Sequence, residues 1–75
     1  MDLNEKLRTM IVKAMQLRGV TSYTEYAKRA GSYRQMIRNR IRKKYLNIVD
    51  VVELFGALGY DVQIRVTDKS TGAEL

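Results

Sequence analysis

The feature that most constrains this fold is a capped helix, a glycine turn and a second, basic helix in the middle of the chain. Ser22 and Glu25 have the Ser-x-x-Glu spacing of a capping box, so a helix is expected to begin at Tyr23. Gly31 follows where a left-handed backbone residue commonly ends a helix. Ser32 is then placed to cap a second helix. The sequence therefore predicts two short helices joined by a tight turn.

The second predicted helix, residues 32–43, separates its apolar and polar side chains when they are placed at 100° intervals. Its apolar side is formed by Tyr33, Met36, Ile37 and Ile41. Its polar side has no acidic residue and is formed by Arg34, Gln35, Arg38, Asn39 and Arg42. Arginine fits the major-groove edge of guanine, and asparagine or glutamine fits that of adenine. A solvated basic face is the alternative, but the cap, the turn and the basic helix together favour nucleic-acid binding. Arg34, Gln35, Arg38 and Asn39 are the expected base readers.

Positive charge is concentrated in the same part of the chain. Residues 25–44 hold eight basic residues and one acidic residue, whereas residues 45–75 hold two and five, within a net charge of +6. A polyanion would be attracted by the middle segment and repelled by the last one. Cations at a helix C-terminus are favourable without any ligand, but their place beside the basic helix favours contact with phosphates. The residues expected to contact phosphate are Arg42, Lys43, Lys44 and, at the start of the first helix, Tyr23. Ser32 and Tyr33, at the start of the basic helix, are also expected to contact the DNA.

These residues resemble the helix-turn-helix of the phage-repressor-like, Xre/Cro-type family of DNA-binding regulators. The resemblance rests on Ala27, Gly31 and Ile37, which match the family's alanine, turn glycine and buried aliphatic residue. It extends over about residues 7–60, including the ending Ala-Leu-Gly-Tyr of residues 57–60. It implies a lambda-repressor-like domain of four to five helices that binds double-stranded DNA.

Two positions depart from the family's pattern. Ser32 and Arg40 stand where the family usually has aliphatic residues, and Ile41 is placed to take over the second role. Helical projection puts Arg40 on the side that should be buried. A buried, unpaired guanidinium is too costly to expect. Arg40 must therefore find a carboxylate, extend its stem to water, or mark early unwinding of the helix.

Two further amphipathic helices are expected to form the scaffold. The first is closed by Gly19, and its apolar residues recur at intervals of three and four: Leu3, Leu7, Met10, Ile11, Ala14 and Met15. The second follows Asn47, a good N-cap, and its expected apolar stripe is Ile48, Val51, Val52, Phe55 and Leu58. Tyr26 is expected to lie in the core, and Phe55 at its centre.

After Gly59 the pattern changes to a strict two-residue alternation. The apolar members are Tyr60, Val62, Ile64 and Val66, so one strand with one apolar face is predicted. The rest of the chain offers no second strand. The economical solution is pairing with the same strand of a second copy through Val62, Ile64 and Val66, and the alternative is an arm lying on its own helices. Residues 68–75 are polar and turn-rich, and are expected to fray.

Composition argues against several classes of function. The chain has no cysteine and no histidine, which excludes a thiolate nucleophile, a histidine base and the usual zinc-ligand sets. No catalytic residues, metal or cofactor are expected, and the absence of cysteine fits a reducing cytoplasm. Residues 1–5 are followed by no continuous apolar region, so no secretion signal, spanning helix or membrane partner is expected.

The sequence as a whole predicts a mostly α protein with a helix-turn-helix domain at residues 1–60. A dimerisation strand and polar tail would occupy residues 61–75. The expected function is that of a homodimeric transcriptional regulator, a repressor of phage, mobile-element or toxin–antitoxin type, that reads a two-fold operator. A toxin or another protein is a further expected partner. The alternative is a protein-binding module, such as a phage-borne inhibitor that presents the basic helix to an acidic partner, and structured RNA is a third target.

Overall fold

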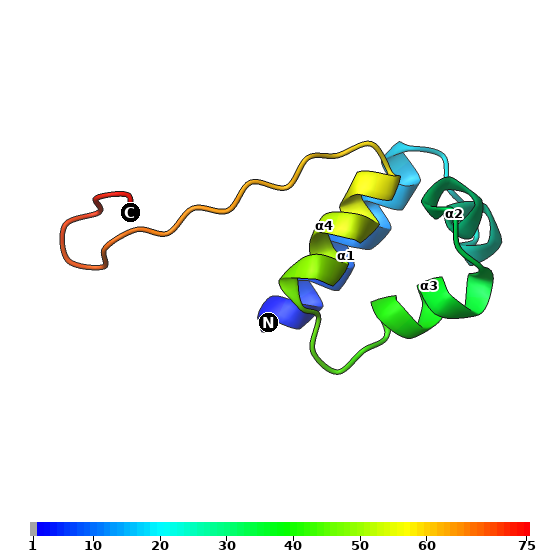
Figure 1. The fold of residues 1–75 in the computed structure, drawn as a ribbon, viewed down its shortest axis with the longest axis horizontal. Helices are drawn as coiled ribbons and strands as arrows, with labels where there is room; N and C mark the ends of the chain where they lie inside the picture. Colours follow the sequence, from blue (N-terminus) through cyan, green and yellow to red (C-terminus); the bar gives the residue numbers. More distant parts are fainter. Residues whose placement is uncertain (1) are drawn as a thin grey trace.

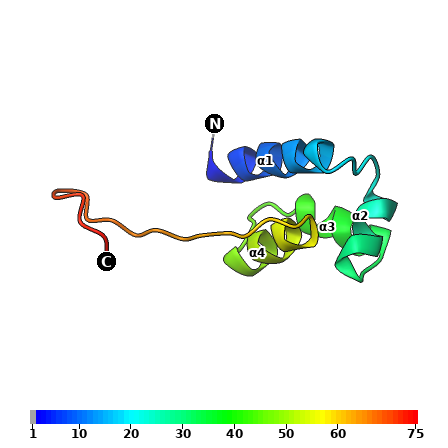
Figure 2. The same ribbon diagram turned by 90° about the horizontal axis from the view of Figure 1, so that it is seen from above.

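Four helices and a long arm make up the computed structural model, which describes residues 2–75. The helices are α1 (Leu3–Leu17), α2 (Tyr23–Ala30), α3 (Arg34–Ile41) and α4 (Ile48–Ala57). Helices α1 and α4 lie side by side, while α2 and α3 pack against each other and close the other side of the domain (Figure 1 and Figure 2). The predicted all-helical domain is confirmed. None of the helices in the described residues is long and apolar enough to cross a membrane.

The first half of the helix-turn-helix forms as predicted. Helix α2 begins at Tyr23, and the Ser22 side chain accepts a hydrogen bond of 3.2 Å from the Glu25 amide. Gly31 ends the helix with φ of 63°, in the left-handed region. Ser32, however, does not cap the next helix. Its amide donates to the Ala27 carbonyl at 2.9 Å, so Ser32 completes the C-terminal turn of α2 instead.

Helix α3 is shorter than the predicted segment at both ends. Its N-cap is Tyr33, which is extended and makes no side-chain capping bond. The expectation that Tyr33 and Met36 face inward is wrong, since they are 62% and 39% exposed. Because the helix has little more than two turns, one pair spaced by four, Ile37 and Ile41, supplies its contact with the core.

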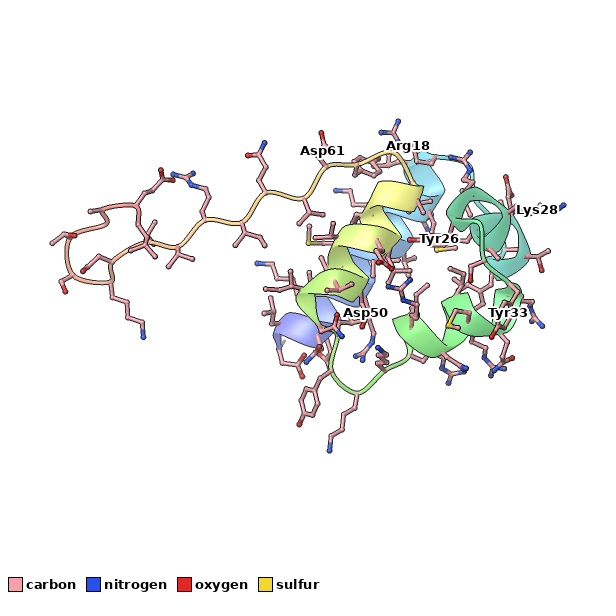
Figure 3. All side chains as sticks on the ribbon, viewed as in Figure 1. Arg18, Tyr26, Lys28, Tyr33, Asp50 and Asp61 are labelled. Atoms are coloured by element: carbon pink, nitrogen blue, oxygen red, sulfur yellow. The ribbon has the colours of Figure 1, made fainter. Side chains whose placement is uncertain are left out.

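The core lies between all four helices, and its centre is Tyr26. This side chain is fully buried, and its hydroxyl donates to the Leu54 carbonyl in α4 at 2.5 Å (Figure 3). The Leu58 amide donates to the Phe55 carbonyl and not to the Leu54 carbonyl. The Leu54 carbonyl therefore lacks a helical donor, and the Tyr26 hydroxyl takes that place. Burial raises the pKa of Tyr26 to about 12, although Arg40 acts in the opposite direction. The buried apolar residues are Ile11, Ala14, Val20, Tyr26, Ala27, Ile37, Ile41, Leu54, Phe55 and Leu58.

Replacing Tyr26 with phenylalanine is expected to lower the free energy of unfolding by about 1 to 2 kcal/mol. The ring would still fill its site, but the Leu54 carbonyl would be buried without its donor. Chemical denaturation of the two proteins measures the difference. A Tyr26→Phe variant as stable as the parent would show that this carbonyl finds another donor.

Helix α4 begins as predicted, and its buried side coincides in part with the predicted stripe. Asn47 and Asp50 form a capping box, in which the Asn47 side chain accepts from the Asp50 amide at 2.8 Å. The predicted inward residues Ile48 and Val52 are 64% and 42% exposed. Phe55 and Leu58 are buried as predicted and Val51 is partly buried, while Asp50 and Leu54 lie inward in place of Ile48 and Val52. The ion pairs of Asp50 described below favour this rotation of the helix.

In α1 the buried apolar residues are Ile11 and Ala14, with Met15 partly buried against the core. Leu3 and Met10, which were also expected inside, are 69% and 48% exposed. Met10 borders a groove between α1 and α4 that is also lined by Val51, Phe55 and Val62. The amphipathic pattern of α1 therefore predicts more buried residues than the other helices of this chain cover.

The arm that follows α4 is extended but forms no sheet within the described residues of this single chain. It projects away from the helices after Val62 (Figure 1), and Ile64 and Val66 are 60% and 56% exposed. The predicted strand is therefore not formed, because the chain itself offers no partner ladder along residues 60–66. The alternative of an arm lying on its own helices holds only for its start, at Tyr60 and Val62.

The last residues of the chain are folded rather than frayed. Asp68 accepts hydrogen bonds from the amides of Ser70 and Thr71 at 2.7 and 3.1 Å, and the chain then turns back on itself. A single antiparallel bridge joins Thr67 and Glu74. The tail expected to be loose is thus a small closed turn at the end of the arm.

Candidate nucleic-acid interface

An exposed row of arginines runs along α3. Arg34, Arg38 and the C-cap residue Arg42 are spaced by four, so their side chains follow one side of the helix. Ile37 and Ile41 occupy the opposite, buried side. The structure thus brings together the arginines that the sequence predicted to share one face.

Gln35 and Asn39 lie next to this arginine row and are bonded to each other. The Gln35 amide nitrogen donates to the Asn39 side-chain oxygen at 3.0 Å, and both residues are exposed. Asn39 keeps its two N–H donors and one lone pair of its oxygen, and Gln35 keeps one N–H donor and its carbonyl oxygen. Each amide therefore retains the donor and the acceptor that a two-pronged contact with adenine uses.

Arg40 finds carboxylates, the first of the three outcomes expected for it. Its Nε donates to Asp50 Oδ1 at 3.0 Å, and its Nη2 donates to Glu53 Oε2 at 2.5 Å. The Asp50 side chain is 5% exposed, so the pair lies at the boundary between α3 and α4. The sequence could not identify these partners, because a projection of one helix does not show which residues of another helix lie beside it.

Lys43 belongs to the same cluster. Its Nζ lies 2.9 Å from Asp50 Oδ2, so Asp50 binds one cation with each oxygen. Burial would raise the pKa of Asp50, but hydrogen bonds from Lys43, Arg40 and the Asn47 amide outweigh it and hold the pKa below its usual value. Lys43, which was predicted to contact phosphate, is 43% exposed and has its ammonium paired with Asp50 in this structure. We name Arg40, Lys43, Asp50 and Glu53 the α3–α4 charge cluster.

The α3–α4 charge cluster separates the cations that have acidic partners from those that have none. It takes up Arg40 and Lys43 and leaves Arg34, Arg38 and Arg42 exposed, without an acidic side chain within ion-pair distance among the described residues. Lys44 is also exposed and lies over the ring of Tyr45, 5.5 Å from its centre. The arginine row is therefore an uncompensated positive surface.

Arg8, in α1, was missed by the sequence reasoning. Its Nε donates to the Ile41 carbonyl at 2.9 Å, and its Nη2 donates to the Lys43 carbonyl. These carbonyls lie at the C-terminal end of α3, where backbone acceptors lack intrahelical partners. Arg8 thus fixes the end of α3, which explains why the helix stops at Ile41 rather than near residue 43. No local pattern marks Arg8, since its partners lie more than thirty residues away in sequence.

The remaining predicted residues sit around the arginine row. Tyr23 is half-buried and lines two hollows, one bordered by Arg34 and the other by Arg42. Tyr33 projects at the N-terminal end of α3 (Figure 3), and Ser32 is exposed in the turn. Val62, Ile64 and Val66 lie on the arm, outside this surface. The structure therefore gathers the predicted DNA-contact residues on one side and leaves the predicted dimerisation residues apart.

No cluster of three metal-ligating side chains occurs in residues 2–75. Comparisons with protein-family models, with curated proteins and with solved structures found no match.

Proposed function

We propose that this protein is a sequence-specific DNA-binding regulator that places α3 in the major groove. The observation that carries the proposal is the uncompensated arginine row beside Gln35 and Asn39, on a helix that follows a short helix and a glycine turn. A merely solvated surface usually intersperses acids with bases. Here the neighbouring acids, Asp50 and Glu53, are bound to other cations. The likeness to the Xre/Cro-type helix-turn-helix supports the same proposal.

The proposed division of roles follows from exposure and position. Arg34, Arg38, Gln35 and Asn39 project from the two turns of α3 and would read base edges. Arg42, Lys44, Tyr23, Tyr33 and Ser32 flank these turns and would bind the phosphate backbone. An antiparallel pairing of two arms would relate two copies by a two-fold axis. Two α3 helices about 34 Å apart, one turn of B-DNA, would then meet the same face of the duplex.

Replacing Arg38 with alanine is expected to weaken operator binding by about 1 to 3 kcal/mol and to relax discrimination at one base pair. The measurement is a titration of labelled duplex, followed by fluorescence anisotropy, with operator and scrambled sequence. Lys69→Ala removes one charge from the tail and serves as the control. An unchanged ratio of the two affinities in Arg38→Ala would exclude Arg38 as a base reader, and a protein that binds an acidic peptide but no duplex would favour the protein-binding alternative.

Arg42 and Lys43 are adjacent cations with different surroundings, so their neutralised variants are expected to differ. Arg42→Gln should weaken all duplexes similarly and reduce the salt slope of binding by about one unit. Lys43→Gln should lower the melting temperature and leave the slope unchanged, because Lys43 binds Asp50. Anisotropy titrations over a series of salt concentrations measure the slopes. Equal slope changes in both variants would place Lys43 on phosphate after all.

A further inference from the structure

The arm has two backbone edges, and its own tail already occupies one of them. The Asp68 amide donates to the Ala73 carbonyl at 2.8 Å, and the Leu75 amide donates to the Val66 carbonyl at 2.9 Å. In an extended chain the N–H and C=O groups of alternate residues point to the same edge. The edge formed by the even-numbered residues is therefore covered by the tail at Val66 and Asp68.

The opposite edge is open. It is formed by the backbone groups of Asp61, Gln63, Arg65 and Thr67, none of which makes a backbone hydrogen bond within residues 2–75. Asp61 and Gln63 border the groove beside α1, and the rest of the arm projects beyond the helical body (Figure 2). A row of unpaired backbone donors and acceptors is a template for another strand. The apolar alternation of Val62, Ile64 and Val66 supplies the side chains that such a strand requires.

We propose that two copies of this chain pair antiparallel through this odd-numbered edge, with the two-fold axis at Gln63. The proposal rests on the homodimer of the proposed function. It adds which edge of the arm forms the contact and which residues face each other. At this register Asp61 of each copy lies opposite Arg65 of the other, and Val62 lies opposite Ile64. Opposite charges on facing residues stabilise antiparallel strands, and like charges destabilise them.

Neighbouring registers lack this complementarity. Centring the pair on Arg65 or on Asp61 places two like charges opposite each other. Centring it on Ile64 places Asp61 opposite Thr67 and Arg65 opposite Gln63, with no charge pair. Arg65 has donors to spare for the new contact, since its Nε lies 2.5 Å from Glu74 and its terminal nitrogens remain free.

The pairing gives the two-arm ribbon one apolar face. At this register Val66 of one copy lies opposite Tyr60 of the other, so the two tail strands, which pair only with residues 66–68, flank opposite ends of the ribbon. Isolated two-stranded ribbons are marginal in water, so the apolar face must contribute to the stability of the pair. That face would carry Val62, Ile64, Val66 and Leu75 from each copy, because even-numbered residues of the arm share one side and Leu75 is joined to Val66.

Charge exchange between the two facing positions tests the register. Asp61→Lys places a lysine opposite Arg65, and Arg65→Asp places an aspartate opposite Asp61, so each variant alone should raise the dissociation constant of the dimer about tenfold or more. An equimolar mixture of the two variants should form heterodimers, because both facing pairs are then of opposite charge. Sedimentation equilibrium of the separate and mixed proteins measures this. Single variants that stay dimeric like the parent, or a mixture that stays monomeric, would overturn the proposal.

Cysteine cross-linking gives an independent readout, since the natural chain has no cysteine. In Gln63→Cys the two cysteines would face each other with Cα atoms about 5.5 Å apart, within disulfide range. In Ile64→Cys they would be diagonal neighbours at about 7 to 8 Å, beyond that range. Oxidation should therefore yield a covalent dimer of Gln63→Cys alone, and the reverse outcome would overturn the register. None of these measurements uses DNA, so the pairing and the proposed function can fail separately. If the arms pair in this register but the protein binds no duplex, only the proposed function is refuted. If the protein binds DNA but the cross-link forms in Ile64→Cys, only this pairing is refuted.

Discussion

Replacing Asp50 with alanine is expected to lower the free energy of unfolding by about 3 kcal/mol, the largest effect on stability among the changes considered. The Asp50 carboxylate is almost fully buried and binds Arg40 with one oxygen and Lys43 with the other. Removing it would leave Lys43 without a counter-ion and Arg40 with only the exposed Glu53, at the boundary between α3 and α4. It would also remove the side-chain half of the capping box at the start of α4. We expect the melting temperature to fall by roughly 12 to 24 °C, as measured by thermal unfolding.

Glu53→Ala is the matched control for Asp50. Glu53 binds the same arginine, but its side chain is 57% exposed. Because exposed ion pairs contribute little, this change should cost less than about 1 kcal/mol. Equal losses in the two variants would show that burial of Asp50 is not what makes the pair important.

The contribution of Asp50 also predicts a pH dependence. Its pKa is lower in the folded protein than in the unfolded chain, so the charged carboxylate stabilises the fold at neutral pH. That stability is lost as the pH falls below about 4 and through the lowered pKa of the folded state. The difference in melting temperature between the parent and Asp50→Ala should therefore shrink in this acidic range. A constant difference down to about pH 2 would contradict the assignment.

Deleting residues 61–75 is expected to lower operator affinity by about 10²- to 10⁴-fold, the largest effect on binding. The arm supplies the proposed contact between copies, and without it each half-site would be bound by a separate monomer. Tyr60 is retained because its ring lies against the core and under Arg18, with 4.2 Å from the guanidinium carbon to the ring centre. Electrophoretic mobility shift on a two-fold operator measures the affinity. Full affinity in the truncated protein would show that the arm takes no part in operator binding.

The truncated protein carries its own control. Its melting temperature should be only slightly below that of the parent when both are measured as monomers, since Val62 is the one deleted hydrophobic residue that packs against the core in the described part of the chain. A large loss of stability would mean that the fall in affinity reflects unfolding instead of lost pairing.

The sequence predicted the elements that depend on local signals. Ser22, Gly31 and Asn47 mark helix ends through their own hydrogen bonds or backbone conformation, and each marks the end expected of it. The burial of Tyr26 and Phe55 also followed from spacing. These features depend on residues three or four apart, which a sequence displays directly.

The features that the sequence did not predict depend on contacts between distant segments. The length of α3 is set by the amide of Ser32 and by Arg8 from α1, and the rotation of α4 is set by the ion pairs of Asp50. Apolar spacing alone placed Ile48 inside and did not predict the burial of Leu54. The same contacts distinguish two neighbouring cations of the candidate site. Lys43 is paired with Asp50, whereas Arg42 has no acidic partner among the described residues.

Affinity selection of the intact protein from a pool of random duplex DNA would show whether α3 reads a two-fold operator. We expect enrichment of an inverted repeat whose half-site centres lie about one turn, or roughly 10 to 10.5 base pairs, apart. Selection that enriches no sequence over the starting pool, at salt concentrations where the duplex is still bound, would contradict this reading mode.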